Sequence, residues 1–422
     1  MHLKCTKCGE SYSVDGMIYY CKRCHFPLEV EYDYQEIAEI LSKREIAKRE
    51  WSIWRYKELL PIKDPASIVS LSEGGTPLRR SRRLAEYLGL TQLYIKDETR
   101  NPTWSFKDRG SSVGVSKALE LGANAVGCAS SGNMAASMAA YAAVAALRCI
   151  ILVPSGTPWE KIAQMLICGA DVISVDKPYP EICNVGIETS GKHGVYWVHN
   201  DAPMRVEGQK TSSFEIAEQL VWAVPDWIVI PTSSGGNMSA HWKAWKELNC
   251  LGLVDGVPAM VVAQAEGCSP IVKAFREKKD KTSSFGEAKT IASAIANPDP
   301  PSGERVLKIL KDSRGAAEAV SDDEILDAQE RLAKTEGLFA EPAGAVSVAA
   351  MSRLISEGKM DKNDRIVCVI TGSGLKDIKN AVRSSGEHAK VKSWDDYEKL
   401  IDGIFSGSPR SQRPLPWGSF AC

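Results

Sequence analysis

Short runs of β-branched and apolar residues alternate with amphipathic, helix-length segments from about residue 85 onward. The helical pattern is clear at 112–121, 161–168 and 213–223. A regular alternation of strands and helices predicts parallel sheets with helices on both faces. We therefore expect an α/β fold, with strands at 92–96, 125–129, 149–153, 171–175, 194–198, 227–231, 259–265 and 365–371.

Two segments depart from this alternation. Residues 280–304 have no clear period, which indicates an irregular excursion or a lid. The tail after about residue 385 is polar, and it ends in a stretch rich in proline, serine and arginine. We expect this tail to be a poorly ordered appendage.

The first 30 residues contain two C-x2-C pairs separated by a twelve-residue spacer. Four thiolates at this spacing suit a structural zinc ion in tetrahedral coordination. The alternative is a reduced hairpin without metal, but so small a unit rarely folds without a metal or a disulfide. We expect zinc, with no open position for catalysis, bound by Cys5, Cys8, Cys21 and Cys24.

The chain carries 52 basic and 53 acidic residues, a net charge of -1. This balance gives no reason to expect nucleic acid or an anionic membrane as a partner. The N-terminus lacks the apolar core of a secretory signal. The longest apolar stretch, 134–153, contains Arg148, which favours a buried helix followed by a strand over a membrane-spanning helix. Eight of the 12 cysteines are scattered singly, which favours a reducing, cytoplasmic location.

Three turns of small residues each follow a predicted strand, at 128–137, 231–239 and 371–377. In open α/β sheets, ligands bind beyond the carboxyl ends of the strands. Glycine and serine let the backbone approach an anion, and a helix N-terminus offers it free N–H groups. The chain has neither the G-x-x-x-x-G-K-[ST] nor the G-x-G-x-x-G pattern. The turns therefore favour a phosphorylated or carboxylate ligand over ATP or a nicotinamide nucleotide.

Lys107 lies in the segment N-P-T-W-S-F-K-D-R-G, directly after Phe106 and at the start of a predicted helix. Desolvation and the helix dipole both disfavour an ammonium ion, and an uncharged amine is a Schiff-base nucleophile. Considered alone, this lysine is better explained as a surface residue paired with Asp108. The other motifs change that interpretation.

The motifs S-F-K-D-R-G, S-S-G-N, S-S-G-G-N and T-G-S-G-L-K-D have the order and spacing of fold-type II pyridoxal-phosphate enzymes. Over about residues 70–378 the chain resembles this family, and within it the threonine synthases, some of which carry a similar ribbon. Further matches lie at 73–78, 205–211, 264–267 and 336–342. The resemblance implies a homodimer. Each chain would have two three-layer, parallel-sheet domains, a large one (31–124 and 206–385) and a small one (125–205). The zinc ribbon (1–30) would precede them and the tail (386–422) would follow.

The resemblance also implies roles for individual residues. Lys107 would form the Schiff base with pyridoxal 5'-phosphate and then move protons at the substrate carbons. The 233–237 turn would hold the cofactor phosphate, Asn133 would hydrogen-bond the 3'-oxygen, and Thr371 would face the pyridine nitrogen. Ser130 and Ser131 would bind the substrate carboxylate. The implied cofactor ligands are Lys107, Asn133, Ser233, Ser234, Gly235, Gly236, Asn237 and Thr371, and the candidates for the substrate phosphate are Ser155, Lys161 and Arg205.

The implied reaction converts O-phospho-L-homoserine and water into L-threonine and phosphate. Trp104 stands where threonine synthases usually have glycine, which leaves a related enzyme open. Such an enzyme would catalyse β-replacement on O-phosphoserine, as a cysteate synthase does, or dehydrate a hydroxy-amino acid. A second alternative is a non-catalytic protein that binds a partner through the ribbon. The motifs at 73–78 and 205–211 favour threonine synthase, and the intact Lys107 and the three turns count against a non-catalytic protein.

Overall fold

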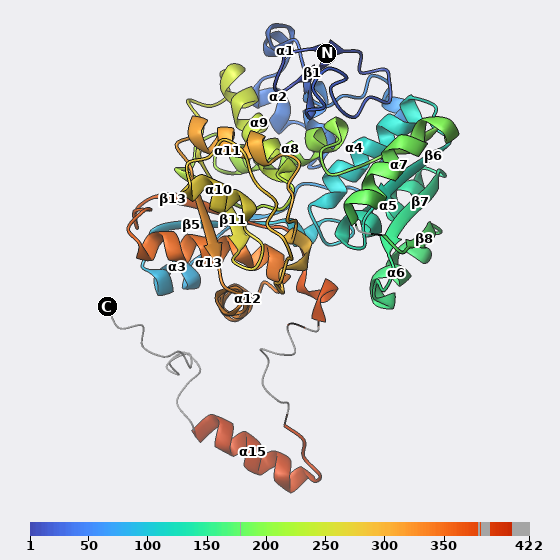
Figure 1. The fold of residues 1–422 in the computed structure, drawn as a ribbon. Coiled ribbons are helices and arrows are strands. Elements are labelled where there is room, and N and C mark those ends of the chain that lie inside the picture. Colours follow the sequence, from blue (N-terminus) through green and yellow to red (C-terminus); the bar gives the residue numbers. More distant parts are fainter. Residues whose placement is uncertain (178, 379, 381–388, 407–422) are drawn as a thin grey trace. The chain divides into compact units, whose positions relative to one another are not determined.

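The structure, a computed structural model, describes residues 1–177, 179–378, 380 and 389–406 (Figure 1). By its internal contacts the chain divides into two compact units, Met1–Ala381 and Val382–Cys422. The described residues of the first unit form three sheets and contain every residue that the sequence assigns to a site. No described helix is both long and apolar enough to span a membrane.

The chain begins with a three-stranded antiparallel sheet in the order β2-β1-β3. Its strands are β1 (His2–Cys5), β2 (Ser11–Tyr12) and β3 (Leu28–Glu31). Leu3, Leu28 and Val30 are fully buried because β1 and β3 alternate between an inward and an outward face. Two α-helices and two 3-10 helices follow: α1 (Tyr34–Ile40), α2 (Lys43–Ala47), η1 (Ile53–Leu59) and η2 (Pro65–Ser67).

A six-stranded sheet has the order β12-β11-β10-β13-β5-β4, and all its neighbours are parallel except β4 with β5. Successive residues of β10 point into different cores: Ile228 and Ile230 pack into one cluster and Val229 into another. Helices therefore cover both faces, as the nearly continuous apolar strands predict. The strands are β4 (Leu78–Arg80), β5 (Gln92–Asp97), β10 (Trp227–Pro231), β11 (Ala259–Ala265), β12 (Ala316–Val320) and β13 (Arg365–Ile370).

The helices around this sheet come from two stretches of the chain, 83–120 and 203–376. They are α3 (Arg83–Leu88), η3 (Glu98–Arg100), α4 (Lys107–Glu120), α8 (Pro203–Gln219), α9 (Gly236–Cys250), α10 (Pro270–Arg276), η4 (Ser293–Ile295), α11 (Gly303–Asp312), α12 (Asp322–Glu336), α13 (Pro342–Ser356) and η5 (Gly374–Lys376). Only η4 lies wholly within 280–304, and α11 begins at its last two residues, so most of this segment is irregular, as expected.

A four-stranded parallel sheet has the order β8-β7-β6-β9. In Figure 1 it forms the green part of the chain, with α5 and α7 beside β6 and β7. Its strands are β6 (Ala125–Ala129), β7 (Arg148–Pro154), β8 (Asp171–Val175) and β9 (Val195–Trp197), and its helices are α5 (Asn133–Val144), α6 (Trp159–Leu166) and α7 (Tyr179–His193).

The predicted α/β class with parallel sheets is confirmed, and all eight predicted strands are present within one residue of their expected ends. These strands belong to two sheets, one of six strands and one of four. The domain boundaries themselves stay a prediction, because the contacts join residues Met1–Ala381 into one unit. In the tail, the structure has a helix that the sequence did not predict, α15 (Trp394–Ser406). Residues 407–422, which belong to the tail that we expect to be poorly ordered, lie outside the described residues.

Candidate active site

Lys107 is the first residue of α4, and this helix packs very closely against α8. The close approach depends on two glycines. A Cβ added at Gly208 would lie 2.0 Å from the backbone oxygen of Arg109, and one added at Gly110 would lie 2.5 Å from Cγ of Arg205. The helix contact therefore brings the first turns of α4 and α8, with Lys107 and Arg205, into one region.

Lys107 is half-buried, and its Nζ lies 4.2 Å from the centre of the Phe106 ring. Burial lowers the pKa of Lys107 well below its ordinary value, and the positive charge of Arg205 lowers it further. The negative charge of Glu341 acts in the opposite direction without reversing the shift. A lowered amine pKa favours the uncharged form, which a Schiff-base nucleophile and a general base both require.

A network of buried charges fixes α4 behind Lys107. Arg109 is fully buried, and its guanidinium donates to Glu98 from Nε at 2.7 Å and to Glu215 of α8 from Nη1 at 2.6 Å. Lys96 of β5 donates to the same Glu215 at 2.7 Å. Burial alone would raise the pKa of Glu98, but Arg109 outweighs it and holds this pKa at about 2. Two acids thus balance two bases, which ties α4, α8 and β5 together.

Asn133 begins α5 and contacts a carboxylate that the sequence reasoning missed. Its Nδ2 donates to Oε1 and Oε2 of Glu341, at 3.1 and 2.9 Å. Glu341 is 6% exposed and stands at the N-cap position of α13 without a side-chain capping bond, and burial raises its pKa. The only sequence signal for it was the family match at 336–342, in which no residue had been given a role.

Thr371 is buried directly after β13, beside the segment that carries Lys107. The N–H of Phe106 donates to the backbone oxygen of Thr371 at 3.0 Å, and the N–H of Ser373 donates to that of Trp104 at 3.0 Å. Trp104 has a φ of 65° and is 48% exposed. The 371–373 turn and the 104–106 segment are thus paired next to Lys107.

Lys376, in the 3-10 helix after this turn, is a second buried lysine in the region. Its Nζ is buried and has no hydrogen-bond partner among the described residues. Burial lowers the pKa of Lys376, while the charges of Glu341 and Asp108 raise it. Glu341 is therefore the acid that Lys107 and Lys376 both face.

The 233–237 turn joins β10 to α9 and is built around a left-handed Gly235, with a φ of 97°. Ser234 Oγ accepts hydrogen bonds from Asn200 Nδ2 at 3.0 Å and Asn297 Nδ2 at 2.7 Å. A Cβ at Gly236 would lie 2.7 Å from the backbone oxygen of Asn200. Both amide atoms of Asn237 are buried without a partner among the described residues. Free N–H groups at a helix start and an unsatisfied amide suit a phosphate group.

The five substrate candidates are not all brought together. Arg205 is buried, and its Nη1 donates to the backbone oxygen of His199 at 3.3 Å and to Asn200 Oδ1 at 3.2 Å, so it lies next to the 233–237 turn. The remaining four all lie in the smaller sheet's part of the chain: Ser130 and Ser131 between β6 and α5, Ser155 after β7, and Lys161 in α6. Among the described residues, no hydrogen bond or ion pair joins the side chain of Ser155 or Lys161 to Lys107 or Arg205.

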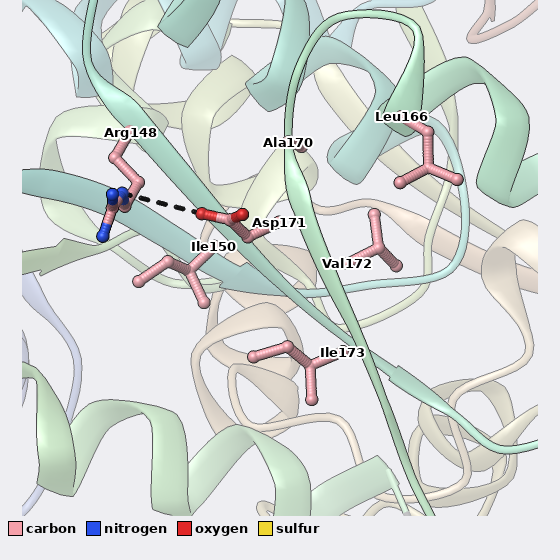
Figure 2. A pocket seen from close by; sticks show the side chains of 7 residues that line it. All are labelled: Arg148, Ile150, Leu166, Ala170, Asp171, Val172 and Ile173. Atoms are coloured by element: carbon pink, nitrogen blue, oxygen red, sulfur yellow. Dashed lines mark ion pairs between the residues drawn. The ribbon is translucent and has the colours of Figure 1, made fainter.

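An open hollow lies elsewhere, at the β8 edge of the four-stranded sheet (Figure 2). Its walls are mostly apolar, and Arg148 Nε lies 3.7 Å from Asp171 Oδ2 at one end. None of the predicted site residues lines it: the lining residues are Arg148, Ile150, Leu166, Ala170, Asp171, Val172 and Ile173.

The four ribbon cysteines converge on one point. Their sulfur atoms all lie within 4.8 Å of one another, and the pair from Cys5 and Cys24 is 3.4 Å apart. Zn–S bonds of about 2.3 Å in a tetrahedron place sulfur atoms roughly 3.8 Å apart. The N–H groups of Lys7 and Cys8 also point at Cys5 Sγ, each at 3.4 Å. The donor set fits a structural zinc ion.

Comparisons with known proteins identify the class of enzyme. Residues 69–372 match the family model of the pyridoxal-phosphate dependent enzymes, and the chain belongs to this family. Over 390 residues it is 45% identical to the threonine synthase of Methanocaldococcus jannaschii, covering 92% of this chain and 96% of that one. It is 42% identical to the threonine synthase of Methanosarcina acetivorans over 407 residues, 96% and 98% of the two chains. Within the family, the chain therefore belongs with the threonine synthases.

Solved structures support the fold alone. The processed form of threonine deaminase isoform 2 from Solanum lycopersicum superposes with a TM-score of 0.64 at 20% identity, covering 88% of this chain and 96% of that one. Maize serine racemase gives a TM-score of 0.61 at 21% identity, with coverages of 78% and 93%. Both superpositions support the α/β fold of this chain.

Proposed function

We propose that this chain converts O-phospho-L-homoserine and water into L-threonine and phosphate, with pyridoxal 5'-phosphate bound at Lys107. The observation that carries the proposal is the position of Lys107, whose amine pKa is lowered, beside Arg205 and the 233–237 turn. The high identity to threonine synthases over nearly the whole chain supports this substrate above the phosphoserine alternative.

The cofactor, when bound, supplies an electron sink that makes the protons on the substrate carbons next to the amino group more acidic. The side chains of this protein do the rest. Lys107, with its lowered pKa, takes protons from Cα and Cβ and returns protons to Cγ and Cα, while phosphate leaves from Cγ and water adds at Cβ. The 233–237 turn holds the cofactor phosphate through N–H groups and the Asn237 amide. Arg205 binds the phosphate of the substrate, for which a planar guanidinium offers two parallel donors.

Two further groups orient the ring of the cofactor. Asn133 would hydrogen-bond the 3'-oxygen of the cofactor. Glu341 fixes the orientation of the Asn133 amide by accepting from its Nδ2 at both carboxylate oxygens. Thr371 would offer a hydroxyl to the pyridine nitrogen, and a hydroxyl does not require that nitrogen to be protonated. Ser130 and Ser131 bind the substrate carboxylate at the start of α5, where the helix dipole favours an anion.

The test is product analysis with purified native protein and O-phosphohomoserine. We expect threonine and phosphate in equal amounts from the native chain and neither from Lys107→Ala. Lys279→Ala, which alters an exposed lysine paired with Glu277, should match the native rate. Threonine formation by Lys107→Ala at the native rate would refute the assignment. Phosphate release from O-phosphoserine in the presence of sulfite, with none from phosphohomoserine, would establish the β-replacement alternative.

We also propose that Cys5, Cys8, Cys21 and Cys24 hold one structural zinc ion, for which the convergence of their sulfur atoms is the support. Metal analysis of protein purified without added metal should find about one zinc per chain, and none in Cys8→Ser. A fully reduced, metal-free native ribbon would refute this.

The homodimer and the cytoplasmic location are proposals that rest on the resemblance and on the scattered cysteines. Light scattering on the purified chain tests the first of these: the mass should be twice the 46.0 kDa of the chain. A tagged chain that separates with the soluble cytoplasmic fraction of its host tests the second.

A further inference from the structure

The N-terminal region, the ribbon and the residues just after it, is joined to α11 and to α8, the helix that carries Arg205. Arg305 of α11 donates to Glu29 of β3 at 2.5 Å, and Tyr32 donates to Glu207 of α8 at 2.8 Å. In Figure 1 the blue N-terminal strands accordingly lie beside α8 and α9. Helix α8 carries Arg205, and the start of α9 forms the 233–237 turn. These contacts explain why the ribbon stays attached, but they do not reach the site itself.

Two adjacent ribbon tyrosines make the contact that does reach it. Tyr19 accepts a hydrogen bond at its hydroxyl from the N–H of Trp197, at 2.7 Å, and its ring meets the His199 ring edge-on. Tyr20 lies over the His199 ring, with the two centres 4.9 Å apart and the planes inclined by 29°. The Tyr20 hydroxyl is also 3.3 Å from His199 Nδ1.

The direction of this hydrogen bond follows from the other partner of His199. The N–H of Asp201 donates to Nδ1 at 3.3 Å, so Nδ1 carries a lone pair and the ring proton lies on Nε2. The Tyr20 hydroxyl must therefore be a donor to Nδ1. The ring of His199, which is 8% exposed, is thus held by Tyr20 from one side and by its own backbone turn from the other.

The 199–205 segment connects His199 to the two groups proposed to bind phosphate, Arg205 and the 233–237 turn. The backbone oxygen of His199 accepts from Arg205 Nη1. The next residue, Asn200, accepts from the same Nη1 and donates to Ser234 Oγ. Its backbone oxygen also fills the space where Gly236 has no side chain. A shift of His199 would move the partners of Arg205 and one wall of the turn together.

We propose that Tyr20 is a positioning residue, whose contact with His199 holds the 199–205 segment and thereby Arg205 and the 233–237 turn in their binding arrangement. The identity of the two phosphate groups rests on the proposed function. In this proposal the ribbon does more than hold the N-terminus in place. Through Tyr20 it also stabilises the position of the residues that bind phosphate.

The test uses three variants of the full chain: Tyr20→Ala, which removes the ring and the hydroxyl, Tyr20→Phe, which keeps the ring, and Tyr34→Phe as control. Tyr34 lies in the same N-terminal region, and its hydroxyl donates to Glu247 of α9 at 3.0 Å, away from the His199 segment. Each variant is stripped of cofactor, and the Kd for pyridoxal phosphate is measured by absorbance titration. The KM and kcat for phosphohomoserine and the Tm are measured as well.

We expect the Kd for pyridoxal phosphate and the KM to rise about 3- to 10-fold in Tyr20→Ala, as for one lost hydrogen bond and ring contact, with kcat within about twofold of native. Tyr20→Phe should fall in between. Tyr34→Phe should lower the Tm while leaving both constants within about twofold of native. The proposal is overturned if Tyr20→Ala and Tyr20→Phe keep native constants, or if Tyr34→Phe weakens cofactor binding as much as Tyr20→Ala does. If Tyr20→Ala does not fold, Tyr20→Phe alone decides between these outcomes.

The cofactor titration contains no amino-acid substrate, so it separates this proposal from the proposed reaction. A native chain that binds pyridoxal phosphate but makes no threonine would defeat the reaction and leave the role of Tyr20 to be decided by the Kd values alone.

Discussion

Replacing Glu341 with glutamine should stabilise the protein and impair the enzyme. Glu341 is buried, and its folded-state pKa is raised above the ordinary value even with Asn133, Lys376 and Lys107 nearby. An acid with a raised folded-state pKa binds its proton more readily in the folded than in the unfolded protein. The charged form therefore weakens folding once the pH exceeds the ordinary pKa. Glutamine has the shape of the uncharged form and avoids that penalty.

The magnitudes follow from the same contacts. At pH 7.5 we expect Glu341→Gln to raise the free energy of unfolding by about 0.5–2 kcal/mol, the range that single stabilising substitutions commonly give. In the active site, the Asn133 amide loses its charged acceptor. A hydrogen bond to a charged group is worth about 1.5–3 kcal/mol and a neutral one about 1, so kcat/KM should fall roughly 3- to 30-fold.

Urea unfolding at pH 7.5 and at pH 4.5 measures the first effect, and steady-state kinetics measures the second. The stability advantage of Glu341→Gln should shrink at pH 4.5, because the native carboxyl then takes up its proton. Glu336→Gln is the matched control, because Glu336 accepts hydrogen bonds from Ser81 Oγ at 2.7 Å and from the N–H of Leu84 at 3.0 Å. This substitution should lower the free energy of unfolding and leave kcat/KM unchanged. A Glu341→Gln variant that is less stable than native at pH 7.5, or equally active, would refute the reasoning.

Three more outcomes are expected. Gly236→Ala places a Cβ against the backbone oxygen of Asn200 and should weaken pyridoxal phosphate binding roughly tenfold or more in the absorbance titration, whereas Gly191→Ala, which meets open space, should not. Arg109→Met leaves Glu98 and Glu215 without their main counter-charge and should lower the free energy of unfolding by about 3–5 kcal/mol in urea; a loss below about 1 kcal/mol would show that the pair is dispensable. A strong zinc chelator should lower the Tm of the native chain and leave that of Cys8→Ser unchanged, and equal shifts in the two would contradict the zinc assignment.

The sequence predicted those parts of the protein that depend on local pattern. The strands that it located are runs of β-branched residues, and the turn at 233–237 could be recognised because glycine and serine there serve the backbone itself. Strand β12 was not among those predicted, since its sequence A-A-E-A-V has a single β-branched residue and becomes a strand only by pairing with β11. Helix α15 was missed because the charged tail hides its apolar positions, such as Trp394 and Phe405.

The part of the site that sequence could not supply consists of contacts between distant segments. Glu341 lies 208 residues from Asn133, and nothing in its own neighbourhood marks it as a partner of that amide. Tyr20 and His199 are separated by 179 residues. Such pairs are set by how helices and sheets pack, which local periodicity does not encode. Ser155 and Lys161 lie in the part of the chain that forms the smaller sheet, whereas Arg205 begins α8, although the resemblance implies all three for one phosphate.

The electrostatics of the helix crossing explain why this site suits an anion. Gly110 and Gly208 let α4 and α8 meet closely enough for Arg205 to lower the pKa of Lys107, which is unfavourable for two bases in a buried place. Glu341 offsets only part of this positive charge, because Lys376 faces it as well. A phosphate bound at Arg205 would supply the missing negative charge and raise the proton affinity of Lys107. Binding of the substrate phosphate would thus help Lys107 to hold the proton that it removes from the substrate. Because the region carries excess positive charge, it would also bind a dianionic phosphate more tightly than an uncharged leaving group.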